Sequence, residues 1–397
     1  MEIFPFILKS NEFKNLKFID LARQKKSRHK IGVNLGTLVD RNIKKVLKHG
    51  QYIMGPEIKK LELKLKKFVG TKYCINVSSG TDALLIALMA LSVTKGDEVI
   101  TTPFSFIATA EVIALLGAKP VYVDIDPKTY NLDPSKLEAK INKKTKAIIA
   151  VSLYGQPAEF EQINQIAKKY SLPVIEDAAQ SFGSTQNGVR SCNLSSIGIT
   201  SFFPSKPLGC YGDGGACFTN NEILAEKIKR ISLHGQEKRY YHTEIGVNGR
   251  LDTIQAAILL AKLEFFDSEI NSRQKLGDYY SKKLNSIGIK NTPYILPKNK
   301  SVFAQYTILI NKRERFQEEL KSKGIPTAVH YPTILPMQPA LNLFSKLEEE
   351  KTLFKNAYFA SQKVVSLPFH PWLKKSEINY IVDHIEKVVI KDSSYLI

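Results

Sequence analysis

A short apolar run, a turn of small residues and a helical pattern follow one another in Tyr73-Cys74-Ile75-Asn76-Val77-Ser78-Ser79-Gly80-Thr81-Asp82-Ala83-Leu84-Leu85-Ile86-Ala87-Leu88. The apolar run predicts a buried strand, and the pattern from residue 82 onward predicts a helix. The first N–H groups of such a helix have no partner within it, so they can bind a phosphate. By itself this is a weak signal, because Ser, Thr and Asp begin many helices.

The same alternation of strand and helix continues along the middle of the chain. Further strands are predicted at 98–101, 120–123, 147–151, 173–176, 197–202 and 215–219, with helical patterns between most of them, such as the one at 158–170. This order is typical of an α/β domain with a mostly parallel sheet that helices cover on both faces. Ligands in such domains bind beyond the carboxyl ends of the strands.

The pattern changes after about residue 265. A long helix is predicted from Ile254 towards Leu284, followed by a strand at 302–310 and helices around 314–323 and 376–389. We therefore expect three parts, which are an irregular N-terminal arm at 1–30, a large α/β domain at 31–265 and a smaller α+β domain at 266–397.

The composition is that of a globular protein. Of the 397 residues, 43% are hydrophobic and 24% are charged, which excludes a disordered chain. No apolar run approaches the roughly 18 residues of a membrane-spanning helix, and the apolar start at 1–8 lacks the pattern of a signal peptide. The four cysteines have no CxxC spacing, so neither a disulfide framework nor a metal site is expected, and a cytoplasmic protein fits.

Basic residues are in excess, since 57 Lys and Arg against 38 Asp and Glu give a formal net charge of +19. Such a charge can indicate nucleic-acid binding. The lysines, however, are spread over amphipathic stretches such as 59–67, which is typical of a solvated helix face, and no nucleic-acid-binding motif accompanies them. We therefore expect no nucleic-acid partner, although the positive field would attract a small anionic substrate. A basic, non-catalytic binding protein is the alternative from another class.

One lysine lies in a stretch that predicts a rigid loop between two strands, Ser201-Phe202-Phe203-Pro204-Ser205-Lys206-Pro207-Leu208-Gly209-Cys210-Tyr211-Gly212-Asp213-Gly214-Gly215-Ala216. The prolines restrict the backbone of this loop, and Gly212, Gly214 and Gly215 allow its tight turns. Lys206 is therefore a candidate for an amine that forms a Schiff base with a carbonyl compound. The alternative is a surface lysine in a turn, which on composition alone is the more frequent case.

A carboxylate at the end of a strand is predicted in Val174-Ile175-Glu176-Asp177-Ala178-Ala179-Gln180-Ser181-Phe182-Gly183. Asp177 can pair there with a cationic ring nitrogen, or it can be a helix N-cap. Gln180 follows three residues later. A phosphate-binding helix start, a carboxylate for a ring nitrogen and a Schiff-base lysine are together the three groups that pyridoxal 5'-phosphate requires.

The order of these three features resembles that of PLP-dependent transferases of fold type I. The segments Glu176-Asp177-Ala178-Ala179-Gln180-Ser181 and Gly212-Asp213-Gly214-Gly215, with Lys206 between them, are similar to the DegT/DnrJ/EryC1 family of sugar aminotransferases. The resemblance extends from about residue 18 to residue 371. It implies an α/β fold with a mostly parallel large-domain sheet, a smaller C-terminal domain, and pyridoxal 5'-phosphate as the cofactor.

The resemblance also implies roles for single residues. Lys206 would bind the cofactor covalently, and Asp177 would pair with its ring nitrogen. The other implied cofactor contacts are Gln180 beside the ring hydroxyl, Gly80, Thr81 and Ser201 at the phosphate, Phe106 stacked on the ring, and Asn248 at the phosphate of the neighbouring subunit. The last contact implies a homodimer with shared active sites.

Within this family, one subgroup is the most similar on the segments 50–57, 151–156, 190–195, 328–332 and 366–371. That subgroup aminates UDP-2-acetamido-2-deoxy-ribo-hex-3-uluronate with L-glutamate, giving UDP-2-acetamido-3-amino-2,3-dideoxy-glucuronate for O-antigen polysaccharides. Many relatives have His where this chain has Ser152. The runner-up is amination of a 4-keto-6-deoxy nucleotide sugar. A dehydrating offshoot of the family has His in place of the lysine, so Lys206 argues against that activity.

Two further residues are candidates for substrate binding. Arg250 could bind the uronate carboxylate or a phosphate, and its alternative is a surface ion pair. His330 could contact the sugar, and a buried structural histidine is equally compatible with the sequence. Packing roles are predicted for four tyrosines, which are Tyr52, Tyr154, Tyr240 and Tyr241.

Overall fold

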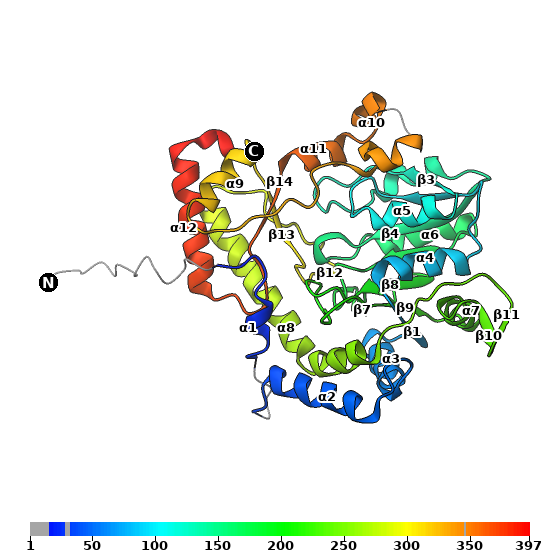
Figure 1. The fold of residues 1–397 in the computed structure, drawn as a ribbon. Helices are drawn as coiled ribbons and strands as arrows, with labels where there is room; N and C mark the ends of the chain where they lie inside the picture. The colour runs from blue at the N-terminus through cyan, green and yellow to red at the C-terminus, as the bar shows by residue number, and fades with distance from the viewer. Residues whose placement is uncertain (1–15, 28–31, 345–346) are drawn as a thin grey trace.

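A computed structural model describes residues 16–27, 32–344 and 347–397 of the chain (Figure 1). Much of the predicted N-terminal arm, including residues 1–15, therefore lies outside the described residues. The first described helix is the short α1, Leu21–Gln24. Among the described residues, no helix has the length and apolar character needed to cross a bilayer.

Within the described residues, seven strands form the central sheet, in the order β1-β9-β8-β5-β4-β2-β3. They are β1 (Tyr73–Val77), β2 (Glu98–Thr101), β3 (Lys119–Tyr122), β4 (Thr145–Val151), β5 (Val174–Asp177), β8 (Ile197–Ser201) and β9 (Gly215–Thr219). The neighbours from β8 to β3 pair in parallel, whereas β9 pairs antiparallel with β8 and β1. The predicted strands and the mostly parallel sheet are confirmed.

Helices cover both faces of this sheet (Figure 1), as the alternation of strands and helices predicted. One face packs against α4 (Gly80–Ala90), α5 (Ala108–Leu115) and α7 (Glu222–Ser232) through strand residues such as Val77 and Ile149. The other face packs against α3 (Pro56–Val69), α6 (Phe160–Lys169) and α8 (Thr253–Ser286) through residues such as Ile148 and Phe218. Successive side chains of a strand point to opposite faces, so strands covered on both sides are continuously apolar.

The other helices and strands flank this sheet or follow it in the chain. They are α2 (Leu35–His49), the small sheet of β6 (Thr185–Gln186), β7 (Val189–Arg190) and β12 (Asn299–Lys300), the hairpin β10 (Gln236–Lys238) and β11 (Tyr241–His242), strands β13 (Tyr306–Leu309) and β14 (Val364–Leu367), and helices α9 (Arg313–Lys321), α10 (Leu347–Leu353), α11 (Lys355–Lys363) and α12 (Lys375–Lys391).

The C-terminal part of the chain has a core of its own. β13 and β14 pair antiparallel and pack with α9, α12 and the end of α8. Tyr280 of α8, Tyr306 of β13 and Phe316 of α9 are fully buried there. Helix α8 runs without interruption across the predicted boundary between residues 265 and 266, and its two ends belong to different cores. The division into domains stays a prediction.

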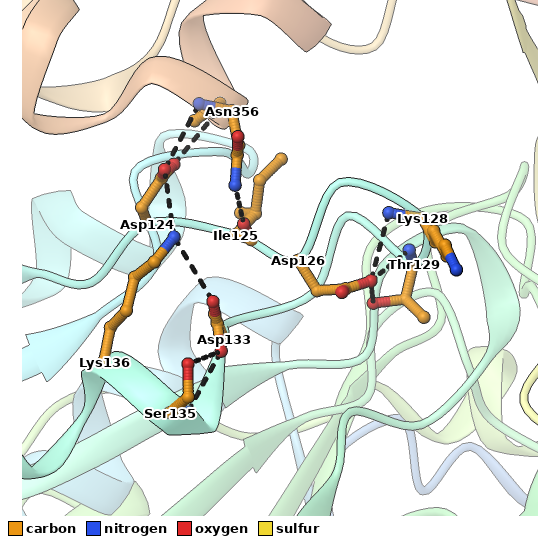
Figure 2. Close-up of polar contacts among 10 residues, drawn as sticks. Asp124, Ile125, Asp126, Lys128, Thr129, Asp133, Ser135, Lys136 and Asn356 are labelled. Carbon is orange, nitrogen blue, oxygen red and sulfur yellow. Dashed lines mark hydrogen bonds and ion pairs between the residues drawn. The ribbon is translucent and has the colours of Figure 1, made fainter.

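Asp124 follows β3 and joins the sheet to the C-terminal part (Figure 2). Its carboxylate accepts hydrogen bonds from the backbone N–H groups of Asn356 at 3.2 Å and Ala357 at 3.0 Å. These residues form the first turn of α11, whose own N-cap residue, Phe354, makes no side-chain cap bond. Lys136 Nζ lies 3.4 Å from the same carboxylate, and the Asp124 side chain is only 3% exposed. Asp124 is therefore a helix cap supplied by the segment that follows β3, far away in the sequence.

We expect Asp124→Ala to lower the free energy of unfolding by about 2 kcal/mol, because two N–H groups lose a charged acceptor. Urea denaturation measures this loss. The matched control is Asp133→Ala, since Asp133 is also ion-paired with Lys136, at 3.2 Å, but accepts its hydrogen bonds from the neighbouring Ser135. The control should lose about 1 kcal/mol or less. Equal losses for the two variants would show that Asp124 does not stabilise α11.

Candidate active site

A cavity of about 450 Å³ opens at the carboxyl ends of the parallel strands. The turn into α4, the segment leading into α5, and the ends of β5 and β8 line it from the sheet, and residues 330 and 331 line it from the C-terminal part. Parallel strands place their carboxyl ends at one edge, so residues far apart in the sequence meet there. Eight of the ten predicted site residues line this cavity, namely Gly80, Thr81, Phe106, Asp177, Gln180, Ser201, Lys206 and His330.

The N-terminus of α4 faces this cavity through Gly80 and Thr81. Ser79 caps the helix, since its hydroxyl accepts a hydrogen bond from the Asp82 N–H at 3.0 Å. A Cβ on Gly80 would lie 2.6 Å from Ser201 Cβ, so only glycine lets the end of β8 approach the helix this closely. The arrangement therefore combines a helix N-terminus with the Ser201 hydroxyl, which are suitable groups for binding a phosphate.

Lys206 lies in a tight loop between β8 and β9, as the prolines and glycines predicted. The loop is closed by backbone hydrogen bonds from Cys210 N to Phe202 O at 2.7 Å and from Lys206 N to Phe203 O at 2.9 Å. Burial lowers the pKa of the Lys206 amine, and the negative charge of Asp177 partly opposes this effect. A lowered pKa increases the fraction of neutral amine, which is the nucleophilic form.

Asp177 is the last residue of β5 and is only 5% exposed. Its Oδ2 accepts a hydrogen bond from Thr109 Oγ1 at 3.0 Å, and its Oδ1 accepts one from Ala179 N at 3.2 Å. Burial raises the pKa of this carboxyl, while both hydrogen bonds and the positive charge of Lys206 lower it. The residues after Asp177 form turns and not a helix, so the alternative interpretation as a helix N-cap is wrong.

Gln180 is held from two sides. Its Oε1 accepts a hydrogen bond from Tyr154 N at 2.8 Å, and its Nε2 donates to Tyr331 OH at 3.0 Å. Burial raises the pKa of Tyr331, so this phenol stays protonated at neutral pH. An amide nitrogen has two N–H groups, and Tyr331 is the one acceptor that Gln180 Nε2 has among the described residues, so the second N–H can donate to a ligand oxygen.

Phe106 and His330 lie on the walls of the same cavity. The Phe106 side chain is 55% exposed, although it is aromatic, and its ring centroid lies 6.3 Å from that of Tyr331. Such an exposed ring can stack on a planar ligand. His330 Nδ1 lies 2.9 Å from Ser366 Oγ, and burial together with Lys206 lowers the pKa of His330 to about 4. The imidazole is therefore neutral at pH 7.

Asn248 and Arg250 line a neighbouring cavity of about 430 Å³, so a single chain does not bring them to Lys206. Asp213 lines both cavities. Arg250 Nη2 donates a hydrogen bond to Asn248 Oδ1 at 2.6 Å, whereas Arg250 Nε is buried and has no partner among the described residues. The two side chains thus form one polar unit beside the main cavity.

Thr109 and Tyr331 are among the residues of the main cavity that were not identified from the sequence. Thr109 follows Phe106 by three residues and Tyr331 directly follows His330, but hydroxyl side chains are too common to be selected on that basis. Their hydrogen bonds to Asp177 and Gln180 identify them. Among the described residues, no group of three or more His, Cys, Asp or Glu side chains is arranged to hold a metal ion.

The predicted packing role of four tyrosines is correct for Tyr154, which is buried, and wrong for the others within one chain. Tyr240 is 81% exposed and Tyr241 is 60% exposed on the β10–β11 hairpin, and Tyr52 is 49% exposed before α3. Sequence patterns mark aromatic residues as apolar but do not tell which surface they cover. These three side chains belong to no hydrophobic core among the described residues.

The chain is similar to known aminotransferases over nearly its whole length. The model of the DegT/DnrJ/EryC1/StrS aminotransferase family matches residues 35–386. A UDP-2-acetamido-2-deoxy-3-oxo-D-glucuronate aminotransferase from Pseudomonas aeruginosa is 56% identical over 366 residues, which is 92% of this chain and 98% of that protein.

Solved structures agree with this. A DegT DnrJ EryC1 StrS aminotransferase from Brucella abortus has a TM-score of 0.88 and 36% identity, covering 94% of this chain and 99% of that one. NtdA from Bacillus subtilis, crystallised with bound cofactor PMP, has a TM-score of 0.84 and 30% identity. The match covers 96% of this chain and 87% of the NtdA chain. The predicted α/β fold of type I is confirmed.

The donor groups of the main cavity fit pyridoxal 5'-phosphate, the cofactor of this family. The cavity offers an amine on Lys206, a buried carboxylate on Asp177 and a helix N-terminus at Gly80. These are the groups that an aldehyde, a ring nitrogen and a phosphate require. The chain belongs to the DegT/DnrJ/EryC1/StrS aminotransferase family and is a PLP-dependent aminotransferase.

Proposed function

We propose that the enzyme transfers an amino group from L-glutamate to the 3-keto group of a UDP-linked 2-acetamido-2-deoxy-3-oxo-hexuronate. The product would be UDP-2-acetamido-3-amino-2,3-dideoxy-glucuronate, formed in the cytoplasm for surface polysaccharides such as O-antigen. The main support for this chemistry is that Lys206 and Asp177 line one cavity at the N-terminus of α4. The name and 56% identity of the relative from Pseudomonas aeruginosa support the choice of sugar.

Several residues of the cavity have distinct tasks in this proposal. When bound, pyridoxal 5'-phosphate supplies a ring that withdraws electrons from the carbon next to the substrate amine. Lys206 Nζ would hold the cofactor aldehyde, and as a free amine the same nitrogen would remove the proton from the Cα of the amino donor. Asp177 pairs with the ring nitrogen. The N–H groups of α4 and the Ser201 hydroxyl would hold the phosphate, and the Phe106 ring would stack on the cofactor ring.

We also propose that the enzyme is a homodimer with shared active sites. A second copy would cover the exposed apolar side chains of Tyr52, Tyr240, Tyr241 and Ile245, the last of which is 84% exposed. Asn248 would then reach the cofactor phosphate of the partner subunit. Arg250 would bind the uronate carboxylate, because its buried Nε has no partner among the described residues and a guanidinium matches a carboxylate.

Amination of a 4-keto-6-deoxy nucleotide sugar remains the second candidate, because the same lysine and aspartate would perform it. Turnover of a panel of 3-keto and 4-keto sugar nucleotides separates the two. The non-catalytic binding protein considered on composition is not supported, since the chain belongs to an aminotransferase family.

Lys206→Ala should abolish turnover, with a loss of at least about a thousandfold, while the protein stays folded. Borohydride reduction followed by peptide mass spectrometry should label wild-type enzyme at Lys206 and leave the variant unlabelled. Lys64→Ala is the matched control, because Lys64 is a surface lysine paired with Glu264. Normal turnover of Lys206→Ala, or labelling at another lysine such as the buried Lys262, would contradict the assigned role.

Arg250→Ala should lower kcat/KM for the 3-keto uronate by about tenfold to a hundredfold, because a hydrogen bond to a charged group is lost. The ratio of kcat/KM for the uronate to kcat/KM for a neutral 3-keto sugar should therefore decrease. Arg315→Ala, an exposed arginine on α9, is the control for the loss of one positive charge. Equal losses on both sugars would show that Arg250 binds the diphosphate or the cofactor instead.

Mixing two inactive variants tests the shared site. In a hybrid dimer of Lys206→Ala and Asn248→Ala chains, one site would combine the intact Lys206 of one chain with the intact Asn248 of the other. Activity should therefore return after the variants are unfolded and refolded together, and not after each is refolded alone. If the mixture stays inactive although hybrid dimers form, each site belongs to one chain.

A further inference from the structure

Thr109 lies directly behind the carboxylate proposed to face the cofactor ring. It is the second residue of α5 and is only 1% exposed. Its Oγ1 lies 3.0 Å from Asp177 Oδ2, although the two residues are 68 positions apart in the chain. Ser105, which is also buried, places its Oγ 3.1 Å from the same Thr109 oxygen.

The chemistry of these groups determines the direction of the hydrogen bonds. An ionised carboxylate only accepts, and a hydroxyl has a single proton to donate. Thr109 must therefore donate to Asp177, and Ser105 must donate to Thr109. The three residues form a chain of hydrogen bonds that leads from Ser105 to the carboxylate. Each bond in such a chain polarises the next one.

We propose that Thr109 is a positioning residue for the cofactor, which keeps the Asp177 carboxylate ionised and oriented towards the pyridine nitrogen, with Ser105 as its support. This inference rests on the proposed role of Asp177. Thr109 acts through Asp177 and not on the substrate.

The surroundings of Asp177 explain why it needs this support. Burial raises the pKa of the carboxyl, and a neutral carboxylic acid would not balance a positively charged ring nitrogen. The groups that lower its pKa are the Ala179 N–H, the Thr109 hydroxyl and the charge of Lys206. Ala179 binds Oδ1, so among the described residues Thr109 is the hydrogen-bond donor for Oδ2. Two donors on two different oxygens also fix the plane of the carboxylate.

Cofactor binding to the unloaded protein tests the proposal without relying on turnover. Thr109→Val keeps the shape of the side chain and removes the hydroxyl. The Kd for pyridoxal 5'-phosphate, measured by visible absorbance, should rise by roughly tenfold to a hundredfold. Thr109→Ser, which restores the hydroxyl, should recover most of the affinity. Ser105→Ala should give a smaller loss than Thr109→Val.

The matched control is Thr101→Val. Thr101 is an equally buried threonine at the end of β2, but its hydroxyl donates to Ile149 O at 3.0 Å and does not contact Asp177. Its Kd for the cofactor should stay within about threefold of wild type, since the removed bond is not part of the site.

A second measurement is the pH at which the visible absorption of the bound cofactor changes. In Thr109→Val this midpoint should move to higher pH, because a less positive ring withdraws fewer electrons from the Lys206 nitrogen. Thr109→Ser should keep the wild-type midpoint. A change in packing alone would not produce a shift that the serine variant reverses.

The outcomes separate this inference from the proposed function. Suppose that Thr109→Val has the wild-type Kd for the cofactor and the wild-type pH midpoint, while Asp177→Asn has a higher Kd and a shifted midpoint. The inference is then wrong, and the role of Asp177 stands. If Asp177→Asn also matches wild type, the proposed role of Asp177 fails. An equal loss of cofactor affinity in Thr109→Val and Thr109→Ser, or in Thr109→Val and Thr101→Val, would show an effect of packing. Either result would overturn the inference.

Discussion

Parallel pairing of β4, β5 and β8 is the constraint on which the active site depends. Neighbouring parallel strands run in the same direction, so Asp177 at the end of β5 and Ser201 at the end of β8 lie at one edge of the sheet. Helix α4 begins at the same edge, at Gly80, and packs closely against Ser201. The arrangement that buries the apolar faces therefore also collects a carboxylate, a hydroxyl and a helix N-terminus around one cavity.

Burial favours the required protonation state of one catalytic group and opposes that of the other. It lowers the pKa of Lys206, which favours the nucleophilic amine, and it raises the pKa of Asp177, which works against the ionised carboxylate. Hydrogen bonds from Thr109 and Ala179 offset that second effect. The C-terminal part completes the cavity through His330 and Tyr331, and it is attached to the sheet by hydrogen bonds such as those of Asp124 to α11.

The strands and the main helices could be predicted from the sequence, because buried parallel strands are continuous apolar runs separated by helical patterns. The local contexts of Lys206 and Asp177 made them candidates, but left a surface lysine and a helix N-cap as alternatives. Their combination with a phosphate-binding helix start, and the family resemblance, gave their predicted roles, and the structure places both side chains in one cavity. The exposure of Tyr240 and Tyr241 could not be predicted. The apolar character of a side chain does not tell whether residues of its own chain or of another chain cover it.

The sequence by itself determined the α/β class, the tight loop around Lys206 and the family, because these depend on local periodicity, turn residues and short motifs. Only the tertiary structure decided that Thr109 binds Asp177 and that Tyr331 binds Gln180, from 151 positions away. It also decided that Asn248 and Arg250 lie in a neighbouring cavity. A hydrogen bond forms only when its two atoms come within about 3 Å. Packing between distant segments sets that separation, and no local pattern of residues encodes it.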